Sequence, residues 1–253
     1  INSLEQHVPL ELWRRPIGAI KAADLVDALT KLRRDVPETG ARVQQRLAAV
    51  FEDAVLRELI DRNPMTGVAR EVRRLVGTQD AGQFKALPFR EAPALLEKLR
   101  KAEGIAARCL ELAVLTAART SEALLASWSE FDLDAALWVV PADRMKVDEE
   151  HTVYLSPKAV ELLKALQAPQ LHPVYLFPSP MKPNQPLSNM AMLTVLNRLG
   201  VRDRTTVHGL CRATFSTWAN ETNAARPDVI EACLAHKEAD RVRAAYNRSD
   251  FAD

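Results

Sequence analysis

The sequence has few cysteines and no long run of apolar residues. Its three cysteines, Cys109, Cys211 and Cys233, are far apart, odd in number and without Cys-x-x-Cys spacing. A disulfide framework or a zinc ribbon is therefore not expected, and a reducing compartment is favoured. No segment approaches the roughly 20 apolar residues that a membrane helix needs, and no signal peptide opens the chain. We expect a cytoplasmic protein with no membrane partner.

An excess of positive charge is also missing. The formal net charge is +1, with 14 basic and 12 acidic residues up to residue 85, and 20 basic and 21 acidic residues beyond it. Neither part of the chain thus has the basic balance typical of nucleic-acid-binding proteins. A local basic face can still bind phosphates while the remaining surface is acidic. A DNA-binding function would therefore depend on where individual arginines lie.

The motifs of several cofactor and metal sites are absent. There is no GxxxxGK loop for a nucleotide, and no cluster of Asp and Glu of the kind that holds Mg²⁺. The side chains that come closest to a zinc set are His208, Cys211, Cys233 and His236. Their HxxC and CxxH pairs fit no common zinc site, and both cysteines fall inside segments expected to be apolar helices. We therefore expect no metal ion and no cofactor.

The organisation of the chain favours two domains. Its 253 residues are 47% hydrophobic, which is enough for one large or two ordinary domains. Residues 18–35 and 39–60 are expected to form amphipathic helices. Over residues 77–88 the helical periodicity is lost, as in an interdomain linker. We expect a helical domain over residues 1–80 and a second domain over residues 86–253. Because the chain does not begin with Met, we expect it to be a piece of a longer protein.

The second domain is expected to be mainly helical with one small hairpin. Residues 137–140 and 151–155 are rich in β-branched and aromatic residues and flank a charged segment, which predicts an antiparallel hairpin. Ser188 is a good N-cap, Gly200 a good C′ residue and Pro227 a good first helical residue. Helices are expected at residues 89–101, 105–118, 157–166, 188–199, 209–220, 227–235 and 238–247, with a short one from Ser121. The predicted fold is an N-terminal helical bundle followed by an α+β domain, mainly α with a small antiparallel sheet.

Four polar segments of the second domain carry a specific pattern. They read LTAARTSEALLASW, ADRMKVDEEHTVYLS, VHGLCRATFSTW and LAHKEADRVRAAYNRSD. Together they resemble the tyrosine recombinases, in particular the phage-type integrases, because Arg, Lys, His with Arg, His and Tyr follow in that order at family-like separations. The resemblance covers residues 112–250 almost continuously, and the helical segment before residue 75 resembles the core-binding domain of this family.

The first matching residues are an arginine and a lysine. Arg119 matches the family's first catalytic arginine, and Glu122 matches the acidic residue that usually supports it. A planar guanidinium can bind two oxygens of one phosphate and stays charged. Lys146 matches the lysine of the family's β-hairpin, which can reach into a DNA groove and protonate a departing oxygen. Taken alone, the arginine could instead complement a helix dipole, and the lysine could be a solvated turn residue.

His208, Arg212 and His236 match the family's remaining arginine and histidine positions. The family usually places two residues between the first histidine and the arginine, whereas this chain has three. Four helical residues turn through roughly 40° beyond a full circle, so both side chains can still face one way. Taken alone, each histidine could instead hydrogen-bond the end of a helix.

Tyr246 is the tyrosine that matches the nucleophile of the family. It lies ten residues after His236, beside charged neighbours in AAYNRSD. The other two tyrosines, Tyr154 in the predicted hairpin and Tyr175 in the apolar run VYLFP, are expected to lie in the core. A phenol has a pKa of about 10 and is therefore protonated near neutral pH, so it needs nearby cations to attack efficiently.

The resemblance implies a reaction that cleaves and joins DNA without metal or ATP. The tyrosine would attack a phosphodiester, form a 3′-phosphotyrosyl bond and release a 5′ hydroxyl. The charges that neutralise the phosphate would come from Arg119, Arg212 and His236. Lys146 would protonate the leaving 5′ oxygen, and His208 would assist proton movement at the tyrosine.

The implied partner is double-stranded DNA at attachment-like sites. In this family strands are exchanged by a tetramer, which here would integrate or excise a mobile element in a bacterial, nucleoid-associated setting. The residues expected to contact DNA are Arg42, Arg46, Arg57 and Arg144. One alternative is a DNA-binding protein of the same fold that does not cut. The other is a type IB topoisomerase, which would relax supercoils as a monomer.

Overall fold

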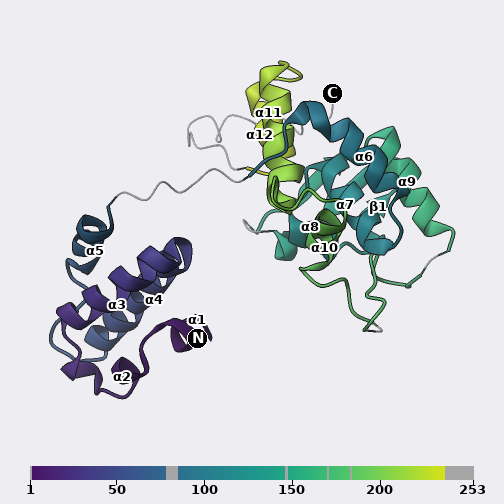
Figure 1. Cartoon of the computed structure of the whole chain (residues 1–253). Helices are drawn as coiled ribbons and strands as arrows, with labels where there is room; N and C mark the ends of the chain where they lie inside the picture. Colours follow the sequence, from purple (N-terminus) through teal and green to yellow (C-terminus); the bar gives the residue numbers. More distant parts are fainter. Residues whose placement is uncertain (1, 78–84, 146–147, 170, 183, 237–253) are drawn as a thin grey trace. The chain divides into compact units, whose positions relative to one another are not determined.

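The computed structural model describes residues 2–77, 85–145, 148–169, 171–182 and 184–236. The chain divides into two compact units, residues 1–83 and 84–253 (Figure 1). This division falls within the segment in which the sequence loses its helical periodicity. Each unit contains its own cluster of buried apolar side chains.

The first unit is a small helical bundle. It contains α1 (Asn2–His7), α2 (Leu10–Trp13), a 3-10 turn η1 (Ile17–Ala19), α3 (Ala22–Asp35), α4 (Pro37–Leu56) and α5 (Val68–Val76). Helix α3 packs against α4 and α5, and α1 packs against α4. The buried faces follow the helical period: Leu25 and Leu29 are one turn apart on α3 and are both buried. A Cβ on Gly40 would lie 2.9 Å from Cδ and 3.0 Å from Cα of Arg33, so a glycine lets α3 and α4 approach closely here.

The ends of the helices in this unit differ from those predicted. The helix expected over residues 39–60 ends at Leu56, because Glu58 takes a left-handed conformation with φ of 58°. Asn63 instead closes a separate turn, in which its Oδ1 accepts a hydrogen bond from the main-chain N–H of Met65 at 2.8 Å. Helix α5 was not predicted, because its nine residues include four charged ones and carry a short apolar stripe.

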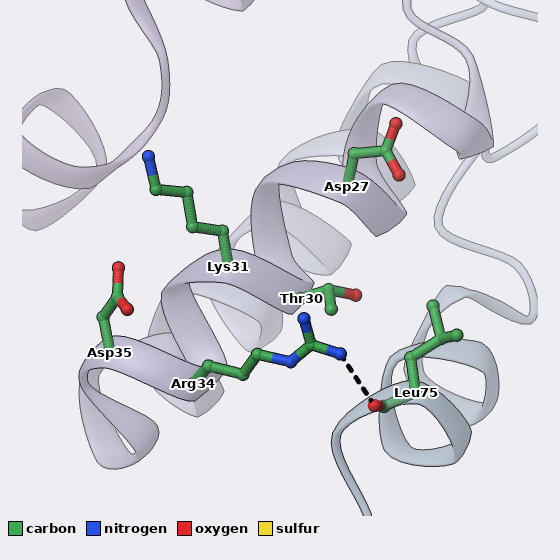
Figure 2. Close-up of a pocket in the computed structure, with 6 residues that line it drawn as sticks. All are labelled: Asp27, Thr30, Lys31, Arg34, Asp35 and Leu75. Carbon is green, nitrogen blue, oxygen red and sulfur yellow. Dashed lines mark hydrogen bonds between the residues drawn. The ribbon is translucent and has the colours of Figure 1, made fainter.

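A shallow hollow lies between α3 and α5 (Figure 2). Arg34 crosses it and donates from Nη2 to the carbonyl oxygen of Leu75 at 3.1 Å. The lining residues are Asp27, Thr30, Lys31, Arg34, Asp35 and Leu75. Two carboxylates balance two cations in this lining, so the hollow does not favour a phosphate.

The second unit is built around α7 (Ile105–Thr116), which packs against α6, α8, α9, α10 and the π-turn η5 (Figure 1). Its residues Ala107, Cys109, Leu110 and Leu112 are completely buried, and a helix that is apolar on most sides is expected to lie inside a domain. The other helical elements are η2 (Phe89–Glu91), α6 (Ala92–Lys101), α8 (Thr120–Leu124), η3 (Trp128–Glu130), η4 (Ala142–Arg144), α9 (Pro157–Gln167), α10 (Ala191–Arg198), η5 (Gly209–Ala213), α11 (Thr214–Glu221) and α12 (Pro227–Cys233).

A three-stranded antiparallel sheet contains the predicted hairpin. Its strands lie in the order β1 (Phe131–Asp132), β2 (Leu137–Val140) and β3 (His151–Tyr154). Val140 pairs with His151 at one end of the hairpin, and β1 is an additional short strand. Trp138 on β2 is fully buried, and its indole N–H donates to Oε2 of Glu130 at 2.9 Å. The mainly helical fold with a small antiparallel sheet is thereby confirmed.

Several local predictions for this unit are confirmed and others are wrong. Gly200 follows α10 with φ of +70°, and Pro227 is the first residue of α12. Ser188 is not an N-cap, because α10 begins only at Ala191. Tyr154 is not a core residue: it is 45% exposed at the end of β3. The helix expected over residues 238–247 lies outside the described residues.

A membrane-spanning element does not occur in the part of the chain that the structure describes, where no helix is both long and apolar enough to cross a bilayer.

Candidate active site

Arg119 is held in place by Glu122 at both ends of its side chain. Helix α7 ends at Thr116, Ala117 turns the chain with φ of +52°, and Arg119 becomes the N-cap of α8. One carboxylate oxygen of Glu122 accepts the main-chain N–H of Arg119 at 2.7 Å, and the other accepts Nη1 at 2.7 Å. The carboxylate is only 3% exposed. A buried carboxylate with two charge-assisted hydrogen bonds fixes the guanidinium firmly.

Arg212 reaches the same place from the π-turn η5 and is itself 4% exposed. Its Nη1 donates to the carbonyl oxygen of Ala117 at 2.9 Å, and its Nη2 donates to that of Leu234. Arg119 donates from Nη2 to the carbonyl oxygens of Leu234 at 3.4 Å and Ala235 at 2.9 Å. Both guanidiniums thus converge on the main chain that follows α12.

His236 completes this cluster. Its Nε2 lies 2.8 Å from Nη2 of Arg212, and its Nδ1 lies 2.7 Å from a carboxylate oxygen of Glu231. A guanidinium can only donate, so Nε2 is the acceptor and the ring proton sits on Nδ1, where it is donated to Glu231. This pair of contacts fixes the orientation of the imidazole.

The charge of the cluster favours an anionic ligand. Arg119 and Arg212 are both cationic, and Glu122 is the buried carboxylate beside them. Burial lowers the pKa of Arg212, and the neighbouring charge of Arg119 lowers it further. Each guanidinium has five N–H groups, and three hydrogen bonds of each go to described residues. Two N–H groups on each remain outside these contacts, and a phosphate could take them up.

His208 stands at the start of the π-turn, within electrostatic range of the cluster. Burial lowers the pKa of its imidazole, and the charges of Arg212, Arg119 and His236 lower it further. The ring is therefore neutral near pH 7 and able to accept a proton. This is the state that the role of proton acceptor requires.

Models of known protein families match both units of the chain. The model of the phage integrase family matches residues 85–253, and that of the phage integrase central domain matches residues 1–71. The chain belongs to the phage integrase family.

Curated relatives of this integrase-family chain include two proteins of Escherichia coli (strain K12). The prophage integrase IntZ is 34% identical over 99% of this chain and 61% of its own length. The prophage integrase IntA is 36% identical over 99% of this chain and 60% of its own length. The chain thus spans about three fifths of the relatives that it matches.

Solved structures of integrases share the fold. A lambda integrase dimer bound to a COC' core site has a TM-score of 0.69 and 15% identity, covering 94% of this chain and 85% of the other. The Tn1549 transposon integrase in complex with transposon right end DNA has a TM-score of 0.70 and 15% identity, covering 98% of this chain and 86% of the other.

Two of the residues to which the resemblance gives roles cannot be placed. Lys146 and Tyr246 lie outside the described residues. Of the other five, Arg119, Glu122, Arg212 and His236 make direct contacts with one another or with shared carbonyls. His208 is linked to them through the charges that shift its pKa.

Arg144, for which a DNA contact is predicted, also binds two groups of its own unit. Its guanidinium is paired with the carboxylate of Glu130, and its Nη2 donates to the main-chain oxygen of Glu122 at 2.5 Å. Its side chain is 15% exposed. These contacts give it a structural role, because they connect η4, which follows β2, to η3 and α8.

The three arginines expected to bind DNA in the first unit are exposed: Arg42 and Arg46 lie on α4, and Arg57 is the residue that follows its last turn. Arg42 pairs with Glu38 at 2.9 Å and Arg57 with Asp53 at 2.7 Å, while Arg46 contacts Ser3. At 3.6 residues per turn, positions 42, 46 and 57 fall within an arc of roughly 60° on one helix face. They therefore form one stripe, although each has a polar neighbour.

His151 is a member of the site's surroundings that the sequence did not point to. It is the first residue of β3 and partly buried. Burial lowers the pKa of its imidazole, Glu122 raises it, and Arg119 and Arg212 lower it. These interactions place it in electrostatic range of the arginine pair. It lies in the segment ADRMKVDEEHTVYLS, but no role was predicted for it there.

Metal-ligating side chains do not gather anywhere in the described ranges, where no group of three or more His, Cys, Asp and Glu is placed to hold an ion. Cys211 is 1% exposed, and burial raises the pKa of its thiol to about 12. A thiol in such surroundings is neither a good metal ligand nor a nucleophile.

Proposed function

We propose that this integrase-family chain is a site-specific DNA recombinase that cleaves and rejoins DNA through a 3′-phosphotyrosyl intermediate. The observation that carries the proposal is the convergence of Arg119 and Arg212 on the carbonyls after α12, with His236 hydrogen-bonded to Arg212. Arg212 is buried, Arg119 is partly buried, and Glu122 is the buried carboxylate beside them, so the pair of guanidiniums favours a bound anion. A phosphodiester is such an anion and matches the planar guanidinium.

In the proposed reaction the hydroxyl oxygen of Tyr246 attacks the phosphorus, and the bond from phosphorus to the 5′ oxygen breaks. The tyrosine proton passes to His208, whose lowered pKa keeps the ring neutral, so that a ring nitrogen is free of a proton before the attack. Lys146 delivers a proton to the leaving 5′ oxygen. Arg119 and Arg212 stabilise the charge that gathers on the non-bridging oxygens, which is the main requirement of phosphoryl transfer.

The proposed reaction needs neither metal nor ATP. The guanidiniums supply the positive charge that a metal ion supplies in other nucleases. The phosphotyrosyl bond replaces the phosphodiester bond, so a 5′ hydroxyl from another strand can reverse the attack and reseal the DNA. This exchange would integrate or excise a mobile element.

The proposed substrate is double-stranded DNA at attachment-like sites. The first unit, residues 1–80 in our assignment, would bind the duplex through Arg42 and Arg46 on α4 and Arg57 directly after it. Residues 86–253 would form the catalytic domain. Lambda integrase forms a tetramer bound to a Holliday junction in one solved structure. We extend the same assembly, and association with the nucleoid, to this protein as part of the proposal.

A nicked suicide substrate tests this function. Duplex DNA carrying the recombination site is nicked near the cleavage position, so that a short fragment leaves and the covalent adduct accumulates. The wild-type chain is incubated with it in EDTA without ATP, beside Tyr246→Phe. Tyr154→Phe is the matched control, because Tyr154 is an exposed strand residue. We expect an adduct with the wild type and with Tyr154→Phe, and none with Tyr246→Phe.

The same assay separates the two alternatives. Binding of the substrate without any adduct indicates a DNA-binding protein that does not cut. An adduct on every sequence tested, together with relaxation of supercoiled DNA by a monomer, indicates a topoisomerase. Loss of the adduct on addition of EDTA contradicts the metal-independent reaction.

A further inference from the structure

The helix that carries His208 and Arg212 is interrupted by a π-turn at Gly209–Ala213. Here the main-chain N–H of Thr214 donates to the carbonyl oxygen of Gly209, an i to i+5 bond. Such a turn encloses one residue more than an α-helical turn, and π-turns are frequent at functional sites. It lies where this chain has three residues between the histidine and the arginine rather than two. The π-turn therefore takes up the additional residue.

The π-turn rests on the main chain of residues 85–87. The carbonyl oxygen of Lys85 accepts the N–H of Thr206 at 3.1 Å and the hydroxyl of Thr205 at 3.1 Å. The hydroxyl of Thr214 lies 2.8 Å from the carbonyl oxygen of Leu87 and 3.1 Å from that of Gly209. Thr214 thus bridges the π-turn and the segment beneath it, and it is only 5% exposed.

The contact between the two main chains is very close at Gly209. A Cβ at this position would lie 2.0 Å from the carbonyl oxygen of Lys85 and 3.1 Å from the hydroxyl oxygen of Thr206. The first of these neighbours is main chain, which cannot swing away as a side chain could. Only glycine lets the main chain of the π-turn approach the main chain of Lys85 this closely.

We propose that Gly209 and Thr214 are positioning residues for the reaction proposed above, because they seat the π-turn that sets where His208 and Arg212 lie. The guanidinium of Arg212 is fixed at its far end by Ala117 and Leu234. The backbone end of the side chain is fixed by the turn. A shift of the turn therefore moves the guanidinium off its carbonyl acceptors and away from His236, and a misplacement of about 1 Å can cost about 100-fold in rate.

Thr214→Val tests the proposal, because it keeps the shape of the side chain and removes the hydroxyl. Thr214→Ser restores the hydroxyl and is the rescue variant. Thr222→Val is the matched control: its hydroxyl also donates to a main-chain carbonyl, that of Trp218 at 2.7 Å, but at the exposed end of α11. Gly209→Ala is measured beside them, since the 2.0 Å approach predicts the larger defect.

The first readout is the single-turnover rate of adduct formation on the nicked substrate, with DNA affinity and thermal stability measured in parallel. We expect Thr214→Val to slow the adduct about 10- to 100-fold, with DNA affinity changed less than about threefold. Thr214→Ser and Thr222→Val should stay within about threefold of the wild-type rate. A wild-type rate in Thr214→Val overturns the proposal, and so does an equal loss in Thr214→Ser.

The second readout does not depend on cleavage. The imidazole signals of His208 and His236 are followed by NMR in the free protein, because the contact between Arg212 and His236 should be disturbed when the turn moves. We expect both signals to shift in Thr214→Val and neither to shift in Thr222→Val. If the wild type forms no adduct, the proposed function is contradicted. The NMR signals still test whether Gly209 and Thr214 position His208 and Arg212. Unshifted signals in Thr214→Val overturn this positioning role.

Discussion

Removing the charge of Glu122 should weaken the second unit and its reaction together. Glu122→Gln keeps the size of the side chain but replaces one carboxylate oxygen by an NH₂ group. In the wild type both oxygens accept hydrogen bonds from Arg119 at 2.7 Å. In the variant one of these donors must face another donor, and the Arg119 and Arg212 charges lose the buried carboxylate that balances them.

The magnitude follows from burial. The carboxylate is 3% exposed and the Arg119 side chain 21% exposed, so the pair is little screened by solvent. Breaking a buried pair by removing one partner costs about 3–5 kcal/mol. Because the guanidinium remains partly hydrated and keeps its carbonyl acceptors, we take the lower end, about 3 kcal/mol. For a unit of this size this corresponds to a fall in Tm of about 6–12 °C.

Tryptophan fluorescence during thermal unfolding measures this change. Three of the four tryptophans belong to the second unit, so the signal reports mainly on its unfolding: they are Trp128, Trp138 and Trp218. The matched control is Glu161→Gln. Its carboxylate is 69% exposed and pairs with Lys158 at 2.8 Å on the surface of α9, so its loss should leave the free energy of unfolding nearly unchanged.

The adduct assay adds the functional half of the prediction. Loss of a group that stabilises the transition-state charge costs about 100- to 1,000-fold in rate, and Glu122→Gln acts indirectly by misplacing Arg119. We expect a fall of about 10- to 100-fold, with DNA affinity nearly unchanged. If Glu122→Gln melts within about 2 °C of the wild type, like Glu161→Gln, the argument from buried charge is refuted.

Three further predictions concern other parts of the molecule. Burial lowers the pKa of His151, so below about pH 6.5 the unfolded chain binds a proton that the folded chain does not bind, and stability falls. In urea unfolding, His151→Gln should therefore lose less stability than the wild type between about pH 7 and pH 5. An equal loss in both proteins contradicts this prediction. Deletion of Cys211 should convert the π-turn into an α-helical turn and keep the adduct rate within about tenfold; a folded variant without activity would show that the turn does more than take up one residue. Arg144→Ala should lower the free energy of unfolding by about 3 kcal/mol, because it breaks the pair with Glu130. It should leave the salt dependence of DNA binding, measured by fluorescence anisotropy, unchanged. Arg57→Ala should instead lower the slope of log K against log salt by up to about 0.9.

Local patterns in the sequence predict the secondary structure of this protein well where the residues of a single helix or strand show a clear apolar or β-branched character. The apolar α7 and the β-branched hairpin strands are of this kind, because their character follows from residues next to one another in the chain. Weak or short elements escape such reasoning. Helix α5 carries a stripe of only a few apolar residues among charged ones, and β1 has two residues that become a strand only by pairing with β2.

Side-chain partners are harder to infer from the sequence, because they depend on distant segments. The residues around Arg144 in the sequence do not point to Glu130, which lies fourteen residues away and binds its guanidinium inside the unit. Tyr154 alternates in a strand as a core residue would, yet it is the last residue of β3 and is 45% exposed. His151 lies in one of the four polar segments without a predicted role, and only folding brings it near Glu122.

The sequence by itself determined the family, the mainly helical fold, and the order of arginines and histidines that this family uses. Only the tertiary structure decided how they meet. Arg119 and Arg212 share the carbonyl of Leu234 through contacts that span 115 and 22 residues, and the π-turn depends on carbonyls of residues 85 and 87, more than a hundred positions earlier. The physical reason is that a hydrogen bond to a main-chain carbonyl depends on where that carbonyl lies in space. Every residue type has the same carbonyl group, so the sequence does not indicate which one will be the acceptor.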